Sequence, residues 1–313
     1  MNSASIINIF TRHTRIWHFW LRDLRSGEVL ELGTRRLYPI GSCFKLAVLM
    51  ACFDALKQSA ELDRPVVIPP DRFRTGGGVI NYLDSAVTLS KRQMLHLMLA
   101  ASDGTTTDWL IAELGLPAVN RVLRGHAPES HLACDLGDMV TAFRQIPESL
   151  DCKTREFSDA ELLNFVDATN VLGATHAQDL AGLALAAWRY PASKMFEPDY
   201  QRCLAVDRYI PRTKMFFDPA IRIFSKTGSI GRNFFMNDCG VLIDRNTGMD
   251  IAHFGFCSSG WRMPGGMVET AGGLIGIEIA RALGLNPVLN SDYTEEGAAL
   301  LLGRSASDNG DVS

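Results

Sequence analysis

The segment Ser42-Cys43-Phe44-Lys45 holds a hydroxyl and an amine at a spacing that suits nucleophilic catalysis. A serine hydroxyl is a poor nucleophile unless a nearby base takes its proton. Because residues three apart share one face of a helix, the Lys45 amine can point toward the Ser42 oxygen. The sequence around Lys45 is apolar, and burial lowers the pKa of a lysine toward that of a useful base. The spacing thus allows Ser42 to act as a nucleophile with Lys45 as its base, although many helices contain such a pair by chance.

Further along the chain, the segment Ala101-Ser102-Asp103-Gly104 holds a second hydroxyl. Ser102 can relay a proton to a leaving nitrogen, as acyl transfer from an amide requires. The same segment also fits a cap or a turn between two helices. Its role therefore depends on what lies beside it in the fold.

A third segment, Ser225-Lys226-Thr227-Gly228-Ser229, stands at the end of a predicted strand. Lys226 offers a fixed positive charge for a substrate carboxylate, and Thr227 and Ser229 offer hydroxyls. Gly228 lets a ligand approach the backbone closely. An edge strand here would also present the backbone N–H of Ser229 to an oxyanion. These groups predict a substrate-binding strand.

Strands near both ends of the sequence are expected to position these groups. Apolar and alternating patterns predict strands over 15–23, 29–32, 221–226, 238–243 and 250–257. Turn residues between the first two ranges predict a hairpin. We therefore expect one sheet that is built from both ends of the chain.

The sequence between these strands is mainly helical in pattern. An apolar stretch without Gly or Pro predicts a buried helix that begins at Ser42, and Thr88 is expected to cap a helix that runs to Leu99. Residues 64–86, rich in Pro and Gly, predict a loop. Further predicted helices cover 105–114, 136–145, 159–167, 177–190 and, after the strands, 266–283.

Taken together and in this order, SxxK, SDx and KTG are the signature set of penicillin-binding proteins and class A β-lactamases. The chain resembles class A β-lactamase-like serine hydrolases, and the similarity continues through TGGGVINYLDSAVTLSKRQMLHLMLAASDGTTTDWLIAELG and SKTGSIGRNFFMNDCGVLID. It covers about residues 15–285. The resemblance implies a β-lactamase-like fold of the α/β class (α+β sandwich type). In that fold an antiparallel sheet subdomain from both termini adjoins an all-helical subdomain, with the site at their junction.

The resemblance also implies a role for each motif residue. Ser42 matches the acylated nucleophile, Lys45 its activating lysine and Ser102 the residue that shuttles a proton. The backbone N–H groups of Ser42 and Ser229 match the oxyanion hole. The implied substrate-binding residues are Lys226, Thr227, Gly228, Ser229 and Gly104.

Two departures from the family pattern bear on activity. The middle motif usually ends in Asn, and Gly104 stands there instead, so an amide that would hold the substrate side chain is missing. The family's deacylating base is a Glu on a later loop, and either Glu161 or Asp159 can be that residue. The same residues also fit the ordinary start of a helix. The chain between Ser102 and Lys226 is longer than usual, with an insertion around 125–160.

We expect Ser42 to form an acyl-enzyme on a β-lactam, ester or amide carbonyl. Without a deacylating base, the acyl group would be hydrolysed slowly or passed to another nucleophile. That chemistry fits an intracellular biosynthetic esterase, acyltransferase or cyclase without β-lactamase activity. A catalytically inactive relative that only binds a ligand is a further alternative. The expected partner is a small molecule with a carbonyl and a carboxylate.

Composition argues against nucleic-acid binding, membrane binding and metal binding. The chain has 313 residues and a formal net charge of -4, without a long basic run, so neither nucleic acid nor a membrane surface is expected as a partner. The histidines form no HExxH pattern and the cysteines no CxxC pair, so we expect neither a metal site nor a cofactor.

Length, cysteine spacing and the first residues predict the domain organisation and the location in the cell. We expect one domain over 1–300, with a sheet subdomain at about 1–48 and 203–287, a helical subdomain at about 49–202, and a tail at 288–313. The seven cysteines are odd in number and widely spaced, which favours free thiols in a reducing compartment. The first residues carry no recognisable secretory signal. These observations predict a cytoplasmic location.

Overall fold

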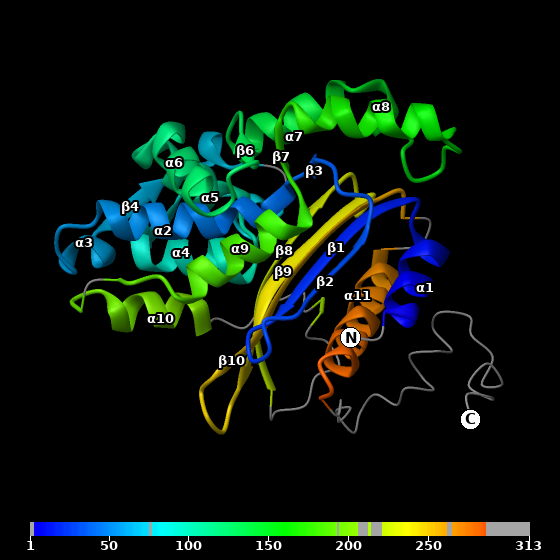
Figure 1. Cartoon of the computed structure of the whole chain (residues 1–313). Coiled ribbons are helices and arrows are strands. Elements are labelled where there is room, and N and C mark those ends of the chain that lie inside the picture. Colours follow the sequence, from blue (N-terminus) through cyan, green and yellow to red (C-terminus); the bar gives the residue numbers. More distant parts are fainter. Residues whose placement is uncertain are drawn as a thin grey trace.

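The computed structural model describes residues 3–74, 77–192, 194–205, 212–213, 221–261 and 265–285, with the backbone alone for 265–268. Within these residues the main sheet has five antiparallel strands in the order β2-β1-β10-β9-β8. The strands are β1 (Ile16–Asp23), β2 (Val29–Gly33), β8 (Ile221–Ile230), β9 (Phe235–Asp244) and β10 (Asp250–Ser259). Figure 1 shows strands from both ends of the sequence side by side in this sheet. The predicted tail at 288–313 lies outside the described residues.

The predicted strands are confirmed, and β8 extends past its predicted end. The sequence pattern indicated a strand over 221–226, whereas β8 continues to Ile230 and pairs with β9 throughout. The added residues include Thr227, Gly228 and Ser229, which interrupt the apolar pattern but still make the backbone ladder. The predicted substrate-binding motif therefore lies within an edge strand of the sheet.

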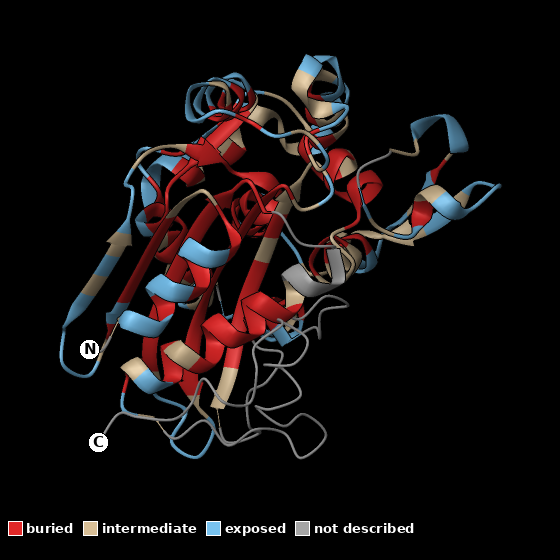
Figure 2. Ribbon diagram, turned by 90° about the vertical axis from the view of Figure 1, so that its right-hand side faces the viewer, coloured by how far each residue is buried: buried red, intermediate tan, exposed pale blue. Residues whose placement is uncertain are grey.

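Helices cover both faces of the sheet. On one face, α1 (Ala4–His13) and α11 (Gly265–Ala282) pack against each other and against apolar side chains of β1 and β10. On the other face, α9 (Ala177–Trp188) packs on β1, β9 and β10. Figure 2 shows the strands buried between helices whose outer faces are exposed. A Cβ atom at Gly255 would lie 2.2 Å from the carbonyl oxygen of Ala177, so glycine permits this close contact.

The helical part is built around α2 (Lys45–Ala55), in which every residue from Lys45 to Phe53 is buried. The predicted buried helix is therefore confirmed, although its first turn is the 3-10 helix η1 (Gly41–Phe44). The other helices are α3 (Ala60–Asp63), α4 (Lys91–Ala100), α5 (Gly104–Leu114), α6 (Leu116–His126), α7 (Leu136–Gln145), α8 (Asp159–Asn170) and α10 (Glu197–Ala205). The 3-10 helices are η2 (Pro70–Arg72), η3 (Ile80–Tyr82) and η4 (Pro147–Ser149). Short strands are β3 (Tyr38–Pro39), β4 (Pro65–Ile68), β5 (Val87–Ser90), β6 (His131–Leu132) and β7 (Gly173–Thr175).

The prediction that Thr88 caps a helix is wrong. Thr88 lies in β5 and pairs with Val67 of β4. The cap of α4 is Ser90, whose hydroxyl accepts from the backbone N–H of Gln93 while the Gln93 side chain reaches back to the Ser90 backbone. This capping box satisfies two backbone donors at once, which explains why the helix begins later than predicted.

Among the described helices, none combines the length and the apolar character that a membrane span requires.

Candidate active site

Ser42 lies in a turn that is pressed against strand β8. Gly41 opens this turn with a φ of 53°, a left-handed conformation that favours glycine. A Cβ atom at Gly41 would lie 2.9 Å from the backbone nitrogen of Ser229. The backbone next to Ser42 and the backbone N–H of Ser229 are therefore neighbours, as an oxyanion hole formed by these two residues requires.

Two further contacts fix the turn on the sheet. A Cβ atom at Gly228 would lie 2.9 Å from both Cys43 Sγ and the carbonyl oxygen of Ile40, so a glycine there allows the turn to approach. The amide of Asn237, in β9, donates to the carbonyl oxygens of Pro39 at 2.7 Å and Ile40 at 3.0 Å. Sequence reasoning missed Asn237, and its one signal is a polar residue in an apolar strand.

Three residues from three distant elements meet at one hydroxyl. Lys45 Nζ lies 3.1 Å from Ser102 Oγ, and Lys226 Nζ lies 3.1 Å from the same atom. Lys45 also donates to the carbonyl oxygens of Ser102 at 2.5 Å and Asp103 at 3.5 Å, and Lys226 donates to that of Thr227 at 2.8 Å. A hydroxyl can accept two hydrogen bonds and still donate its own proton. Ser102 is thus placed to exchange protons with Lys45.

The structure differs from the expected contact between Lys45 and Ser42. Among the described residues, Lys45 Nζ makes its hydrogen bonds to Ser102 and Asp103, and none to Ser42. The two residues lie in consecutive helical segments, because Ser42 is in η1 and Lys45 begins α2. The Lys45 amine therefore rests on Ser102 in this structure.

Burial lowers the pKa of Lys45 to about 7, and the charges of Asp103 and Asp108 oppose that effect. The residue is completely buried, so its ammonium form loses the hydration that it has in water. A lysine with this pKa is neutral in a large fraction of molecules near neutral pH. Lys45 can therefore accept a proton under ordinary conditions.

Ser102 has an unusual backbone conformation that its neighbours hold in place. Its φ is 54°, which costs about 1–3 kcal/mol for a residue other than glycine. Asp103 caps α5 by accepting from the backbone of Thr106 at 2.9 Å. Its other oxygen accepts from the backbone N–H groups of Val79 at 2.8 Å and Ile80 at 3.1 Å. Asp103 thus ties the preceding loop to the helix and fixes Ser102 between them.

Gly104 is buried at the start of α5. Its backbone N–H donates to the carbonyl oxygen of Gly77 at 3.1 Å. A Cβ atom at Gly104 would lie 3.4 Å from a methyl group of Leu136. The backbone oxygens of Gly77 and Arg74 would lie at 3.5 and 3.7 Å from it, so this position borders both apolar and polar atoms.

The structure gives Glu161 the helix-start role that the sequence also allowed. It forms a capping box with Ser158 at the start of α8, and its other oxygen accepts from Arg155 at 2.7 Å. These bonds lower the pKa of Glu161 to about 2. Asp159 is paired with Arg15, and its side chain is 91% exposed. A carboxylate with so low a pKa is a weak general base.

A buried arginine that sequence reasoning missed supports the oxyanion strand. Arg212 is 1% exposed and donates to Ser229 Oγ at 2.9 Å and to the carbonyl oxygen of Gly228 at 3.2 Å. Its guanidinium also makes two bonds of 2.8 Å to the carboxylate of Glu269 on α11. This paired geometry matches the planar fork of arginine. The sequence around Arg212 shows no pattern that points to this role.

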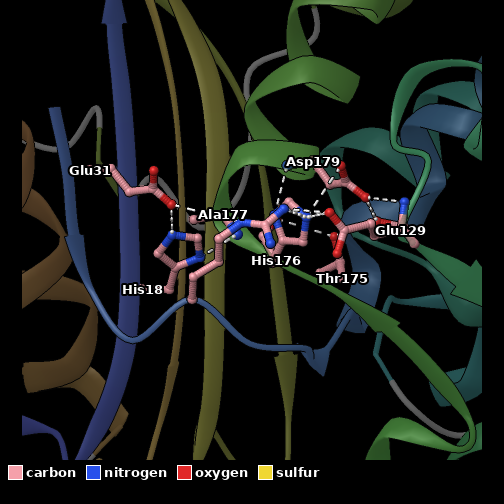
Figure 3. Close-up of polar contacts among 9 residues, drawn as sticks. His18, Glu31, Glu129, Thr175, His176, Ala177 and Asp179 are labelled. Atoms are coloured by element: carbon pink, nitrogen blue, oxygen red, sulfur yellow. Dashed lines mark hydrogen bonds and ion pairs between the residues drawn. The ribbon is translucent and has the colours of Figure 1, made fainter. Parts of the chain in front are cut away.

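A second polar cluster lies behind the site and joins the sheet to the helical part (Figure 3). This histidine cluster comprises His18, Glu31, Arg35, Glu129, Ser130, Thr175, His176 and Asp179. His18 Nε2 lies 2.9 Å from Glu31, and His18 Nδ1 accepts from the backbone N–H of Ala177 at 3.2 Å. His176 caps α9. The two histidines thus link β1 and β2 to the start of α9.

Comparisons with known proteins find a matching family and matching folds. A family model described as the beta-lactamase enzyme family matches residues 3–262. A β-lactamase from Sphaerobacter thermophilus DSM 20745 is 19% identical, with a TM-score of 0.69 and coverage of 91% of this chain and 97% of that chain. A class A β-lactamase from Bacteroides cellulosilyticus DSM 14838 is 16% identical, with a TM-score of 0.66 and coverage of 90% and 95%.

A third structure, PBP-A, is 17% identical, with a TM-score of 0.63 and coverage of 89% of this chain and 96% of that chain. No curated protein matches the sequence. At such low identities the structural matches show the fold, while the family model spans most of the sequence. The chain therefore belongs to the beta-lactamase enzyme family and has the fold of class A β-lactamase-like serine hydrolases.

Proposed function

We propose that Ser42 is acylated by a small carbonyl compound, which can be a β-lactam, an ester or an amide. The observation that carries this proposal is the meeting of Lys45 and Lys226 at the Ser102 hydroxyl, 3.1 Å from each amine. Lys45 is fully buried with hydroxyl and carbonyl oxygens as its described hydrogen-bond partners, and such burial of a lysine is costly. Packing alone does not explain two buried amines at one hydroxyl, whereas a role in proton transfer does.

In the proposed reaction, the Ser42 oxygen bonds to the carbonyl carbon while its proton passes to neutral Lys45. The backbone N–H groups of Ser42 and Ser229 stabilise the oxyanion. The bond from carbon to the leaving nitrogen or oxygen then breaks, and that atom takes the Ser102 proton. Lys45 returns its proton to Ser102, so both residues end in their starting states. Lys226 keeps its charge and attracts a substrate carboxylate.

The acyl-enzyme is expected to be long-lived. The carboxylate that best fits the family's deacylating base in sequence, Glu161, is used in its capping box and ion pair. A weak base activates water poorly. The acyl group would then remain on Ser42 until a better nucleophile than water takes it. This favours an acyltransferase, a cyclase or a slow esterase over an efficient β-lactamase.

Covalent labelling tests this proposal. The protein is incubated with a fluorescent penicillin or with p-nitrophenyl acetate, and its intact mass is followed over hours. The expected result is one acyl group at Ser42 that persists, and no adduct in Ser42→Ala. Ser26→Ala, which changes an exposed turn serine, serves as the matched control. No adduct with either reagent, or an adduct that survives Ser42→Ala, would overturn the proposal.

A reducing, cytoplasmic setting remains part of the proposal. All seven cysteines are free thiols, and six of them are buried. Free cysteines are typical of proteins in reducing compartments. A biosynthetic or self-resistance role inside the cell agrees with this observation.

A further inference from the structure

A cavity of about 590 Å³ opens beside the strand that carries Ser229. One wall is the end of β8 with its turn toward β9, from Ser229 to Asn233. The opposite wall is α7, and the segment 149–154 closes the side. Drug-sized ligands occupy pockets of this size. The cavity begins at the proposed oxyanion donor and lies along β8 on the side away from Lys226.

The inner part of this cavity is apolar. Its apolar lining comprises Leu136, Met139, Val140 and Phe143 of α7 and Ile230 of β8. Leu136 also lies next to Gly104 of the motif that carries Ser102. At the rim, Leu150 leaves 83% of its surface exposed. Apolar surface of this kind favours an apolar group, at about 25 cal/mol per Å² that is buried.

The outer part of the cavity is positively charged. Arg144, Lys153 and Arg232 line it, with Asp151 as the one acidic residue among the lining side chains. Arg144 and Arg232 are exposed. In the part of the chain that the structure describes, neither of these two arginines has an ion pair. A guanidinium in this state is well suited to bind a carboxylate.

We propose that this cavity holds the acyl group that is transferred to Ser42. The acyl group is apolar, at least as large as an aromatic ring, and carries a carboxylate at its outer end. This inference rests on the proposed acylation of Ser42 and names the substrate class for it. The carbonyl lies between Ser42 and Ser229, the ring lies against Leu136 and Ile230, and the carboxylate reaches Arg144 or Arg232.

Three p-nitrophenyl esters separate the parts of this inference. They are the acetate, the phenylacetate and the (4-carboxyphenyl)acetate. We expect kcat/KM, corrected for the spontaneous rate of each ester, to rise about tenfold from acetate to phenylacetate, because one buried ring contributes that much. The added carboxylate should raise it by a further factor of about five, as a charged contact near the surface allows.

Two variants assign these gains to the cavity. Val140→Phe fills the apolar part and should remove the preference for the ring while acetate still reacts. Val171→Phe, at a position on the surface that is 69% exposed, is its control. The double variant Arg144→Gln with Arg232→Gln should remove the preference for the carboxylate alone. Arg124→Gln, on an exposed face of α6, is the control for charge.

The outcomes distinguish this inference from the proposed function. If no ester acylates Ser42, the proposed function fails and the inference fails with it. If acetate acylates Ser42 but the ring gives no gain, or the carboxylate lowers kcat/KM, the inference alone is overturned. A preference that persists unchanged in Val140→Phe and in the arginine double variant would also contradict it.

Discussion

Among the described residues, the proposed active site and the histidine cluster both lie where the sheet meets the helical part, and they balance charge in opposite ways. In the histidine cluster the basic side chains face carboxylates, since Arg35 pairs with Glu129 and His176 lies 3.2 Å from Glu129 and 3.5 Å from Asp179. In the site, Lys45 has hydroxyl and carbonyl oxygens as its described hydrogen-bond partners. The two networks also differ in depth, since the side chains of Arg35 and Glu129 are about half exposed while Lys45 is fully buried.

This difference separates a structural network from a reactive one. Carboxylate partners stabilise a buried cation and keep its proton in place. Carbonyl and hydroxyl oxygens satisfy hydrogen bonds without neutralising the charge, so burial lowers the pKa of Lys45 to about 7. Strongly perturbed groups in a cleft are candidates for function. The histidine cluster should therefore govern stability, and the site should govern activity.

The largest expected effect is that of Lys45→Met. The acylation rate of Ser42 should fall by about 10³-fold, because the base is lost. The free energy of unfolding should change by less than about 1 kcal/mol, since removal of an unpaired buried charge offsets the lost hydrogen bonds. Stopped-flow acylation and urea unfolding measure the two quantities. A loss of several kcal/mol in stability would show that Lys45 has the same role as the cations of the histidine cluster.

The converse experiment is Asp179→Ala in the histidine cluster. Asp179 accepts from Ser130 Oγ at 2.8 Å and from the backbone of Glu129 at 2.9 Å. Leaving these donors unsatisfied should lower the free energy of unfolding by about 2 kcal/mol, with kcat/KM within about twofold of the parent at temperatures where the variant is folded. A variant of unchanged stability but poor activity would reverse the assignment of the two clusters.

A smaller effect is expected from Gly41→Ala, which compares two left-handed glycines. The added Cβ would lie 2.9 Å from Ser229 N, so the nucleophile and the oxyanion strand must separate, and acylation should slow about tenfold. Gly27, with a φ of 78° and open space around it, is the matched control. Gly27→Ala should cost about 1 kcal/mol of stability and leave acylation intact. Equal effects of both variants on acylation would show that Gly41 contributes only its backbone conformation and not its close contact with Ser229.

The smallest expected effect is a pH dependence of stability in the histidine cluster. Burial lowers the pKa of His18, while Glu31 raises it and His176 and Arg35 lower it further. Since the folded pKa lies below the unfolded value of about 6.5, this contribution is fully present above that pH and is lost as the pH falls toward the folded pKa.

Urea unfolding at about pH 7.5 and pH 5 measures the contribution of His18 to the free energy of unfolding. The pKa of His18 in the unfolded chain is taken as that of an ordinary histidine. His18→Asn keeps an acceptor for the backbone N–H of Ala177 and should lose less stability between the two conditions than the parent. An identical loss in parent and variant would assign the pH dependence to other groups.

The sequence predicted much of the site because its motifs are short and local. The Ser42–Lys45 spacing, the hydroxyl of Ser102 and the strand with Lys226 each follow from a few neighbouring residues. The resemblance to a known family supplied their order in space. Their meeting at a single oxygen atom required the structure, because Lys45 and Ser102 are 57 positions apart in the sequence and Ser102 and Lys226 are 124 positions apart.

What the sequence missed depends on long-range contacts. Arg212 acts through Glu269 and Ser229, and Asn237 acts through the turn before Ser42. No local pattern identifies such residues. The register of Ser158–Glu161 left two alternatives open, and the capping box that the structure shows depends on side-chain direction rather than on residue type. Helix α1 was also missed, since its apolar residues pack on the distant α11.

The pH dependence of the acylation rate tests the central claim most directly. Single-turnover acylation of the parent protein by p-nitrophenyl acetate is measured from about pH 5 to pH 9, a range that brackets the lowered pKa of Lys45. If Lys45 is the base, the rate rises as the pH increases, with a midpoint near 7, and levels off above it. A rate that is independent of pH through this range, or a midpoint that is unchanged in Lys45→Met, would contradict the account.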